Sequence, residues 1–117
     1  MNKVAVMILA NNESHADMGR LANALELAKE SRENGDEIRV IFDGAGTRWV
    51  PEIDRQDHTL HKLYSAVSDV SVACAFCAAV FEVKDQVQAT GVQLVSEYES
   101  HPSIRKILVE RSQVVTF

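Results

Sequence analysis

The two cysteines of this chain lie three residues apart, at positions 74 and 77, within an apolar segment. Residues Val70 to Ala73 predict a short buried strand, and the residues from Ala78 onward predict a helix. Cys74 would then end a strand and Cys77 would lie in the first helical turn, where free N–H groups favour a thiolate. Because a thiolate is a nucleophile, this segment is the first candidate for chemistry. The alternative is two small core residues, since free cysteine is among the most buried residue types.

Length and composition describe one globular domain, which we expect to span residues 1–117. The chain is 46% hydrophobic and 25% charged, and its formal net charge of −5 argues against binding to nucleic acid or an anionic membrane. No apolar run is long enough to span a membrane, and we find no export signal. We therefore expect a cytoplasmic protein, in which two neighbouring cysteines indicate reactive or metal-binding thiols rather than a structural disulfide.

Short apolar runs alternate with amphipathic segments along the whole chain. We expect strands at residues 4–9, 38–42, 70–73, 92–95 and 114–117, and helices at about 14–34, 57–67, 77–89 and 102–110. Residues 43–51 predict a flexible loop. This alternation predicts a three-layer α/β/α fold with a mostly parallel five-stranded sheet.

The fold predicts which residues share a site, because ligands of open α/β sheets bind beyond the carboxyl ends of the strands. The segments leaving those ends are residues 11–15, 43–46 and 96–99, together with Cys74 itself. We therefore expect Cys74 to lie at a polar edge, with His15 as a neighbour that stabilises its thiolate.

Other kinds of site lack residues that they need. Gly44 and Gly46 do not form a dinucleotide-binding loop, because Trp49 stands where the third glycine should be. Trp49 is better interpreted as a packed loop anchor.

We predict no metal site. His58 and His61 could share a helix face, but two further ligands are missing, so we interpret them as surface residues. The cysteine pair also lacks a second ligand pair. A thioredoxin-type dithiol would have Gly-Pro between its cysteines, whereas this chain has Ala75 and Phe76.

Several segments together resemble the DsrE/DsrF-like proteins, which include the Tus sulfur-relay subunits and the YchN-like proteins. The similar segments are a helix containing Ala24 to Ala28, the strand and loop over 34–44, the cysteine strand around Cys74, and the strand over 91–95. The resemblance extends over essentially the whole chain. Each motif is weak alone, and their order and spacing carry the similarity.

The resemblance implies a sulfur carrier, and thus a candidate sulfurtransferase. A cysteine at the position of Cys74 would accept sulfane sulfur as a persulfide and pass it to an acceptor protein, without a cofactor. Cys77 would be a resolving or supporting thiol. The resemblance also implies a trimer or a hexamer, which is hetero-oligomeric in the Tus and Dsr complexes and homo-oligomeric in the YchN-like proteins. For this single chain we expect a homo-oligomer. Two alternatives remain open: a binding or structural oligomer with core cysteines, and a thiol–disulfide or metal-linked redox protein using Cys74 and Cys77.

Overall fold

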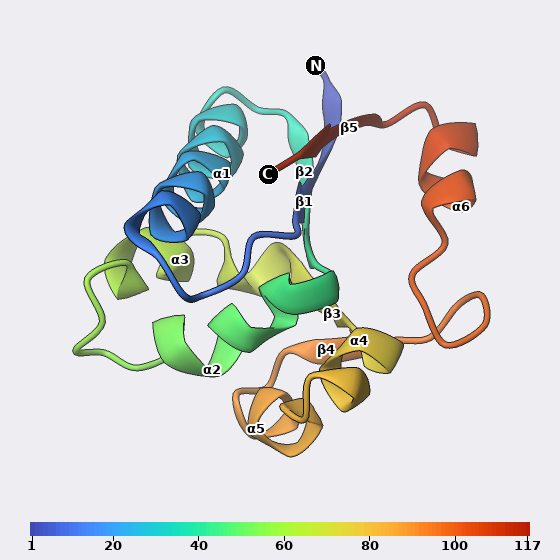
Figure 1. The fold of residues 1–117 in the computed structure, drawn as a ribbon. Coiled ribbons are helices and arrows are strands. Elements are labelled where there is room, and N and C mark those ends of the chain that lie inside the picture. The colour runs from blue at the N-terminus through green and yellow to red at the C-terminus, as the bar shows by residue number, and fades with distance from the viewer.

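Five parallel strands form the centre of the computed structural model, which describes all residues 1–117 (Figure 1). The strands are β1 (Lys3–Ile8), β2 (Glu37–Phe42), β3 (Ser71–Cys74), β4 (Gln93–Val95) and β5 (Gln113–Thr116). They lie in the order β4-β3-β2-β1-β5, and every neighbouring pair is parallel. The predicted α/β fold is confirmed, and each predicted strand is present within one residue of its expected bounds at either end.

The helices are mostly short. The α-helices are α1 (His15–Glu33), α2 (Trp49–Ile53), α3 (His61–Ser65), α4 (Ala75–Val80), α5 (Lys84–Ala89) and α6 (Ile104–Val109), and two 3₁₀ helices are η1 (Gly44–Arg48) and η2 (Ser68–Val70). Only α1 exceeds two turns, and Ser14 caps it by accepting a hydrogen bond from the Asp17 N–H. No helix combines the length and the apolar character that crossing a membrane requires.

Two helix predictions were wrong in extent. The helix expected over 57–67 is only α3, whereas the expected loop after β2 folds into η1 and α2. The helix expected over 77–89 is two helices, α4 and α5. They are separated at Glu82, whose φ of 58° lies in the left-handed region and cannot continue a right-handed helix.

The two faces of the sheet bury very different amounts of apolar surface. Alternate residues of β1, such as Val6, face α1 and belong to a cluster of 18 buried residues. Ala5 and Met7 face the other way and pack with Ile41 and Ile107 in a cluster of four. Figure 1 shows α1 and α3 on one side of the sheet and α6 on the other.

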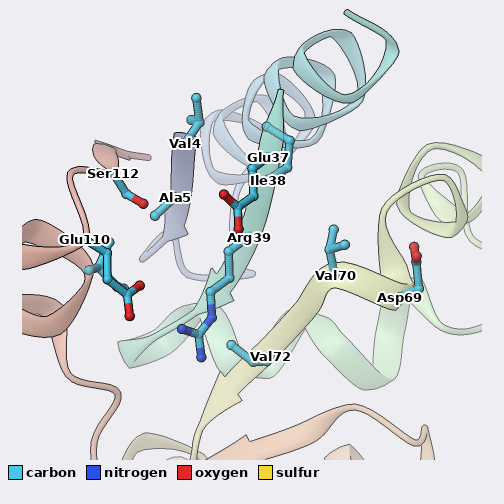
Figure 2. Close-up of a pocket in the computed structure, with 11 residues that line it drawn as sticks. Val4, Ala5, Glu37, Ile38, Arg39, Asp69, Val70, Val72, Glu110 and Ser112 are labelled. Carbon is cyan, nitrogen blue, oxygen red and sulfur yellow. The ribbon is translucent and has the colours of Figure 1, made fainter. Parts of the chain in front are cut away.

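A groove of about 320 Å³ opens on the α6 side, at the amino-terminal half of the strands. Figure 2 shows Arg39 extending into it from β2, between Val72 and Glu110. No residue of this groove is a cysteine or a histidine. The side chains that could carry out chemistry lie instead at the opposite, carboxyl ends of the strands.

Candidate functional site

Cys74 is the last residue of β3 and the N-cap of α4. Its side chain has no exposed surface, and its Sγ accepts a hydrogen bond from the Cys77 N–H at 3.4 Å. The tight turn from strand to helix therefore brings both sulfur atoms to the carboxyl edge of the sheet.

Cys77 lies in the first turn of α4 and is partly exposed. Its thiol donates to Oδ1 of Asp43 at 3.2 Å. Asp43 directly follows β2, and β2 and β3 are neighbours in the sheet, so their carboxyl ends lie side by side. The backbone holds this carboxylate in place, because Asp43 N–H donates to the Ile8 carbonyl and Oδ1 accepts from the Gly44 N–H.

His101 completes the cluster from the segment between β4 and α6. Its Nδ1 lies 3.3 Å from Cys74 Sγ. The turn from Tyr98 to His101 presents the ring, with Glu99 at a φ of 47° and Ser100 at 70°. Neither residue is a glycine, so this conformation costs free energy that the surrounding contacts must offset.

Contacts to α4 and α6 fix that turn. The Phe76 N–H donates to the Ser100 carbonyl at 2.9 Å, and the rings of Phe76 and His101 lie 4.6 Å apart between centroids. At the base of the turn, the Glu97 carboxylate accepts from the Ser103 N–H at 3.1 Å and from Lys106 at 3.3 Å. The hydrogen bond from Ser103 is the main cause that lowers the pKa of Glu97.

Neither cysteine is a thiolate by virtue of its surroundings. Burial raises the pKa of the Cys74 thiol. Burial, followed by the hydrogen bond to Asp43, raises the pKa of Cys77 to about 12. The expectation that a helix N-terminus favours the thiolate was therefore wrong for the free thiols. Helix α4 has only six residues, and its dipole does not offset the loss of water and the nearby carboxylate.

The structure brings together some of the predicted site residues and not others. Cys74, Cys77 and Asp43 meet at the predicted edge. His15 does not join them: it begins α1 with an exposed side chain, and the histidine beside Cys74 is His101. His101 follows the fourth strand by a few residues, so the same edge argument, extended beyond residue 99, would have found it.

The other singled-out residues are structural. His58 lies before α3 rather than on it, and its Nδ1 accepts from the Leu60 N–H. The Nδ1 atom of His61 lies 2.8 Å from the Ile53 carbonyl oxygen, so the two histidines have different partners. Trp49 is buried, and its Nε1–H donates to the Ala10 and Asn11 carbonyls, which confirms it as a packed anchor.

Four potential ligand atoms thus converge where the sequence predicted no metal site. One ligand atom each from Asp43, Cys74, Cys77 and His101 can be chosen so that all four lie within 4.8 Å of one another. The second pair of ligands, absent from the local sequence, comes from the end of β2 and from the segment between β4 and α6.

Comparison with known proteins identifies one relative by sequence and one protein of similar structure, neither with an assigned activity. No protein-family model matches the chain. The uncharacterized protein MJ0733 of Methanocaldococcus jannaschii is 29% identical over 107 residues, which cover 91% of this chain and 88% of the relative. A protein of unknown function from Bacteroides thetaiotaomicron, BT1422, has a similar structure, with a TM-score of 0.60, 18% identity and coverage of 97% and 94% of the two chains. This structural similarity supports the fold alone.

Proposed function

We propose that this protein carries sulfane sulfur as a persulfide on Cys74. The observation that supports the proposal is the 3.3 Å contact between Cys74 Sγ and His101 Nδ1. A neutral imidazole with its proton on Nε2 can accept the thiol proton, so a thiolate forms when a donor arrives. The resemblance to sulfur-relay proteins points to the same residue.

Sulfur loading is a thiol exchange. The Cys74 thiolate attacks the terminal sulfur of a donor persulfide, R–S–SH, forming the new sulfur–sulfur bond of Cys74–S–SH. The donor's own sulfur–sulfur bond breaks, and R–S⁻ leaves and takes the proton that His101 held. The oxidation level of the transferred sulfur is conserved, so no external oxidant or reductant is needed.

Cys77 gives the persulfide a second outcome. If its thiolate attacks Cys74 Sγ, the terminal sulfur leaves as hydrosulfide and a disulfide joins Cys74 to Cys77. The raised pKa of Cys77 slows this attack, which favours transfer of the sulfur to the thiol of an acceptor protein. Burial of Cys77 and its hydrogen bond to Asp43 thereby protect the loaded state.

Because Cys74 has no exposed surface, loading also requires a movement. The turn from Tyr98 to His101 ends in the side chain that contacts this sulfur, and its strained residues Glu99 and Ser100 favour an opening there. In this proposal the protein works in the cytoplasm as a homo-oligomer, a trimer or a hexamer. Light scattering coupled to gel filtration measures the number of chains.

The test is the intact mass of metal-free protein after incubation with cysteine persulfide. We expect a gain of one sulfur atom that is lost in Cys74→Ser, slowed in His101→Gln and longer-lived in Cys77→Ser. His15→Gln, outside the cluster, is the matched control and should load like the parent. No gain in the parent, or a gain that survives Cys74→Ser, would contradict the proposal.

Two alternatives correspond to other outcomes of the same experiment. Rapid formation of a Cys74–Cys77 disulfide with any oxidant, without a stable sulfur adduct, indicates a thiol–disulfide redox protein. Thiols that stay unmodified until the protein unfolds indicate a binding or structural module with core cysteines.

A further inference from the structure

We propose that Cys74, Cys77, His101 and Asp43 form a binding site for Zn²⁺. Two thiols, one imidazole and one carboxylate supply S, S, N and O ligands, a set that zinc takes in tetrahedral coordination. The inference does not depend on sulfur transfer, because it concerns the resting protein without a donor.

The distances fit a tetrahedron that is almost assembled. With zinc–sulfur bonds of about 2.3 Å and zinc–nitrogen or zinc–oxygen bonds of about 2.0–2.1 Å, a sulfur and a lighter ligand lie about 3.5 Å apart. Cys74 Sγ to His101 Nδ1 is 3.3 Å, and Cys77 Sγ to Asp43 Oδ1 is 3.2 Å. The longest separation within the group is at most 4.8 Å, so shifts of about 1 Å complete the site.

The backbone already orients the four ligands. The Asp43 carboxylate accepts from the Gly44 N–H, Cys74 Sγ accepts from the Cys77 N–H, and the Phe76 ring packs against that of His101. Such support around metal ligands fixes their direction. Nδ1 is the imidazole nitrogen that contacts Cys74 Sγ, so it would be the ligand.

No positively charged side chain balances the Asp43 carboxylate within the cluster. Asp43 forms no ion pair, and no lysine or arginine donates a hydrogen bond to any of the four side chains. A divalent cation would compensate the carboxylate and stabilise two thiolates directly. Thiolate ligands favour zinc over magnesium and calcium, which take oxygen ligands.

A bound zinc would join three parts of the chain: the end of β2, the turn from β3 into α4, and the segment before α6. It would also occupy both sulfur atoms, so the zinc-bound protein would not load sulfur. Zinc binding and sulfur loading would then exclude each other, and a thiol-rich donor or acceptor would compete with the protein for the metal.

The first experiment measures zinc binding to the intact chain. The protein is treated with EDTA, incubated with one equivalent of Zn²⁺ and gel-filtered. Its zinc content is then measured by inductively coupled plasma mass spectrometry. We expect one zinc per chain and a higher melting temperature, because zinc binds the folded chain through parts far apart in sequence. No retained zinc would overturn the proposal.

Cobalt identifies the ligands. Co²⁺ bound at this site should give intense tetrahedral d–d bands and a sulfur-to-cobalt charge-transfer band. Both should be lost in the Cys74→Ser with Cys77→Ser double variant and changed in His101→Gln. Asp43→Asn, which keeps an oxygen that can cap Gly44, should weaken Zn²⁺ binding by about tenfold or more. His15→Gln is the control and should bind like the parent.

The outcomes separate the two proposals. Zinc that stays bound when both cysteines are replaced is bound elsewhere and would overturn the assignment, as would cobalt spectra without a charge-transfer band in the parent. Circular dichroism of each metal-free variant establishes that it is folded, and the cobalt spectrum of the unmodified protein tests the site without any substitution. Failure of sulfur loading in metal-free protein leaves these results unchanged.

Discussion

At the scale of single residues, the chemistry of the cluster depends on one carboxylate. Burial, followed by the hydrogen bond that the Cys77 thiol donates to Asp43, raises the pKa of Cys77 to about 12. A raised thiol pKa keeps the unreactive form at neutral pH, and the thiolate appears only as the pH rises toward that value. Asp43 therefore disfavours the Cys77 thiolate in the metal-free protein, and it is a candidate ligand when a cation is present.

Replacement of Asp43 by asparagine should make Cys77 more reactive. In a Cys74→Ser background, where Cys77 is the sole thiol, Asp43→Asn removes the negative charge and should lower the Cys77 pKa. Each unit of decrease gives about tenfold more thiolate at neutral pH, and iodoacetamide should modify Cys77 correspondingly faster. The measurement is the alkylation rate between pH 7 and 10 with EDTA present. Equal rates with and without Asp43 would show that burial alone sets the pKa.

At the scale of elements, the segment that carries His101 is held by the carboxylate of Glu97. The Ser103 N–H, Lys106 and Arg39 all lower the pKa of Glu97. A lowered folded-state pKa means that the ionised form stabilises the native state. This contribution is present above the ordinary value of 4.5 and is lost as the pH falls through the lower folded-state value.

We therefore expect Glu97→Gln to reduce the acid sensitivity of the fold. The variant should melt at a lower temperature than the parent at pH 6, and the difference should shrink as the pH falls toward 3. Glu99→Gln is the matched control, because Glu99 is exposed and makes no side-chain hydrogen bond or ion pair. A pH-independent difference between Glu97→Gln and the parent would show that the carboxylate charge contributes nothing.

Replacing Gly46 by alanine tests the close approach between η1 and β1, and replacing Gly19 is the control. A Cβ added at Gly46 would overlap the carbonyl group of Ile8, whereas one added at Gly19 in α1 would meet no atom within 4 Å. Gly46→Ala should destabilise the protein by about 1–3 kcal/mol, because the backbone must shift. Gly19→Ala should stabilise it by about 0.5–1 kcal/mol through helix propensity. Urea unfolding measures both, and a neutral Gly46→Ala would show that η1 moves freely away from β1.

An element could be predicted from the sequence where a local residue pattern determines it. The strands were predictable because their apolar runs reflect burial on both faces of a parallel sheet. The break between α4 and α5 and the turn before His101 were not, because Glu82, Glu99 and Ser100 adopt left-handed conformations that glycine usually signals. Asp43 and Cys74 could be placed at one edge from topology alone. His101 lies just beyond the segment expected at that edge, and its contact with Cys74 depends on the turn at Glu99 and Ser100.

At the scale of the whole molecule, the sheet divides the chain into a well-packed and a thinly packed half. The α1 side holds a cluster of 18 buried residues, and the α6 side holds four. Helix α6 contributes Ile107 as its buried residue, while Leu108 and Val109 are exposed. Little apolar surface therefore opposes local detachment of α6 and its preceding turn.

Amide hydrogen exchange should reproduce this division. We expect amides of α1, β1 and β2 to exchange only by global unfolding, and those of α6 to exchange about tenfold faster or more through local opening. Because His101 lies just before α6, one equivalent of Zn²⁺ should slow exchange around residues 97–107 more than in α1. The His101→Gln variant, measured under the same conditions, should lose this zinc-dependent protection while keeping slow exchange in α1. Equal exchange in α1 and α6 of the metal-free protein would mean that the sheet unfolds as one unit, and α6 could not then open separately to expose Cys74.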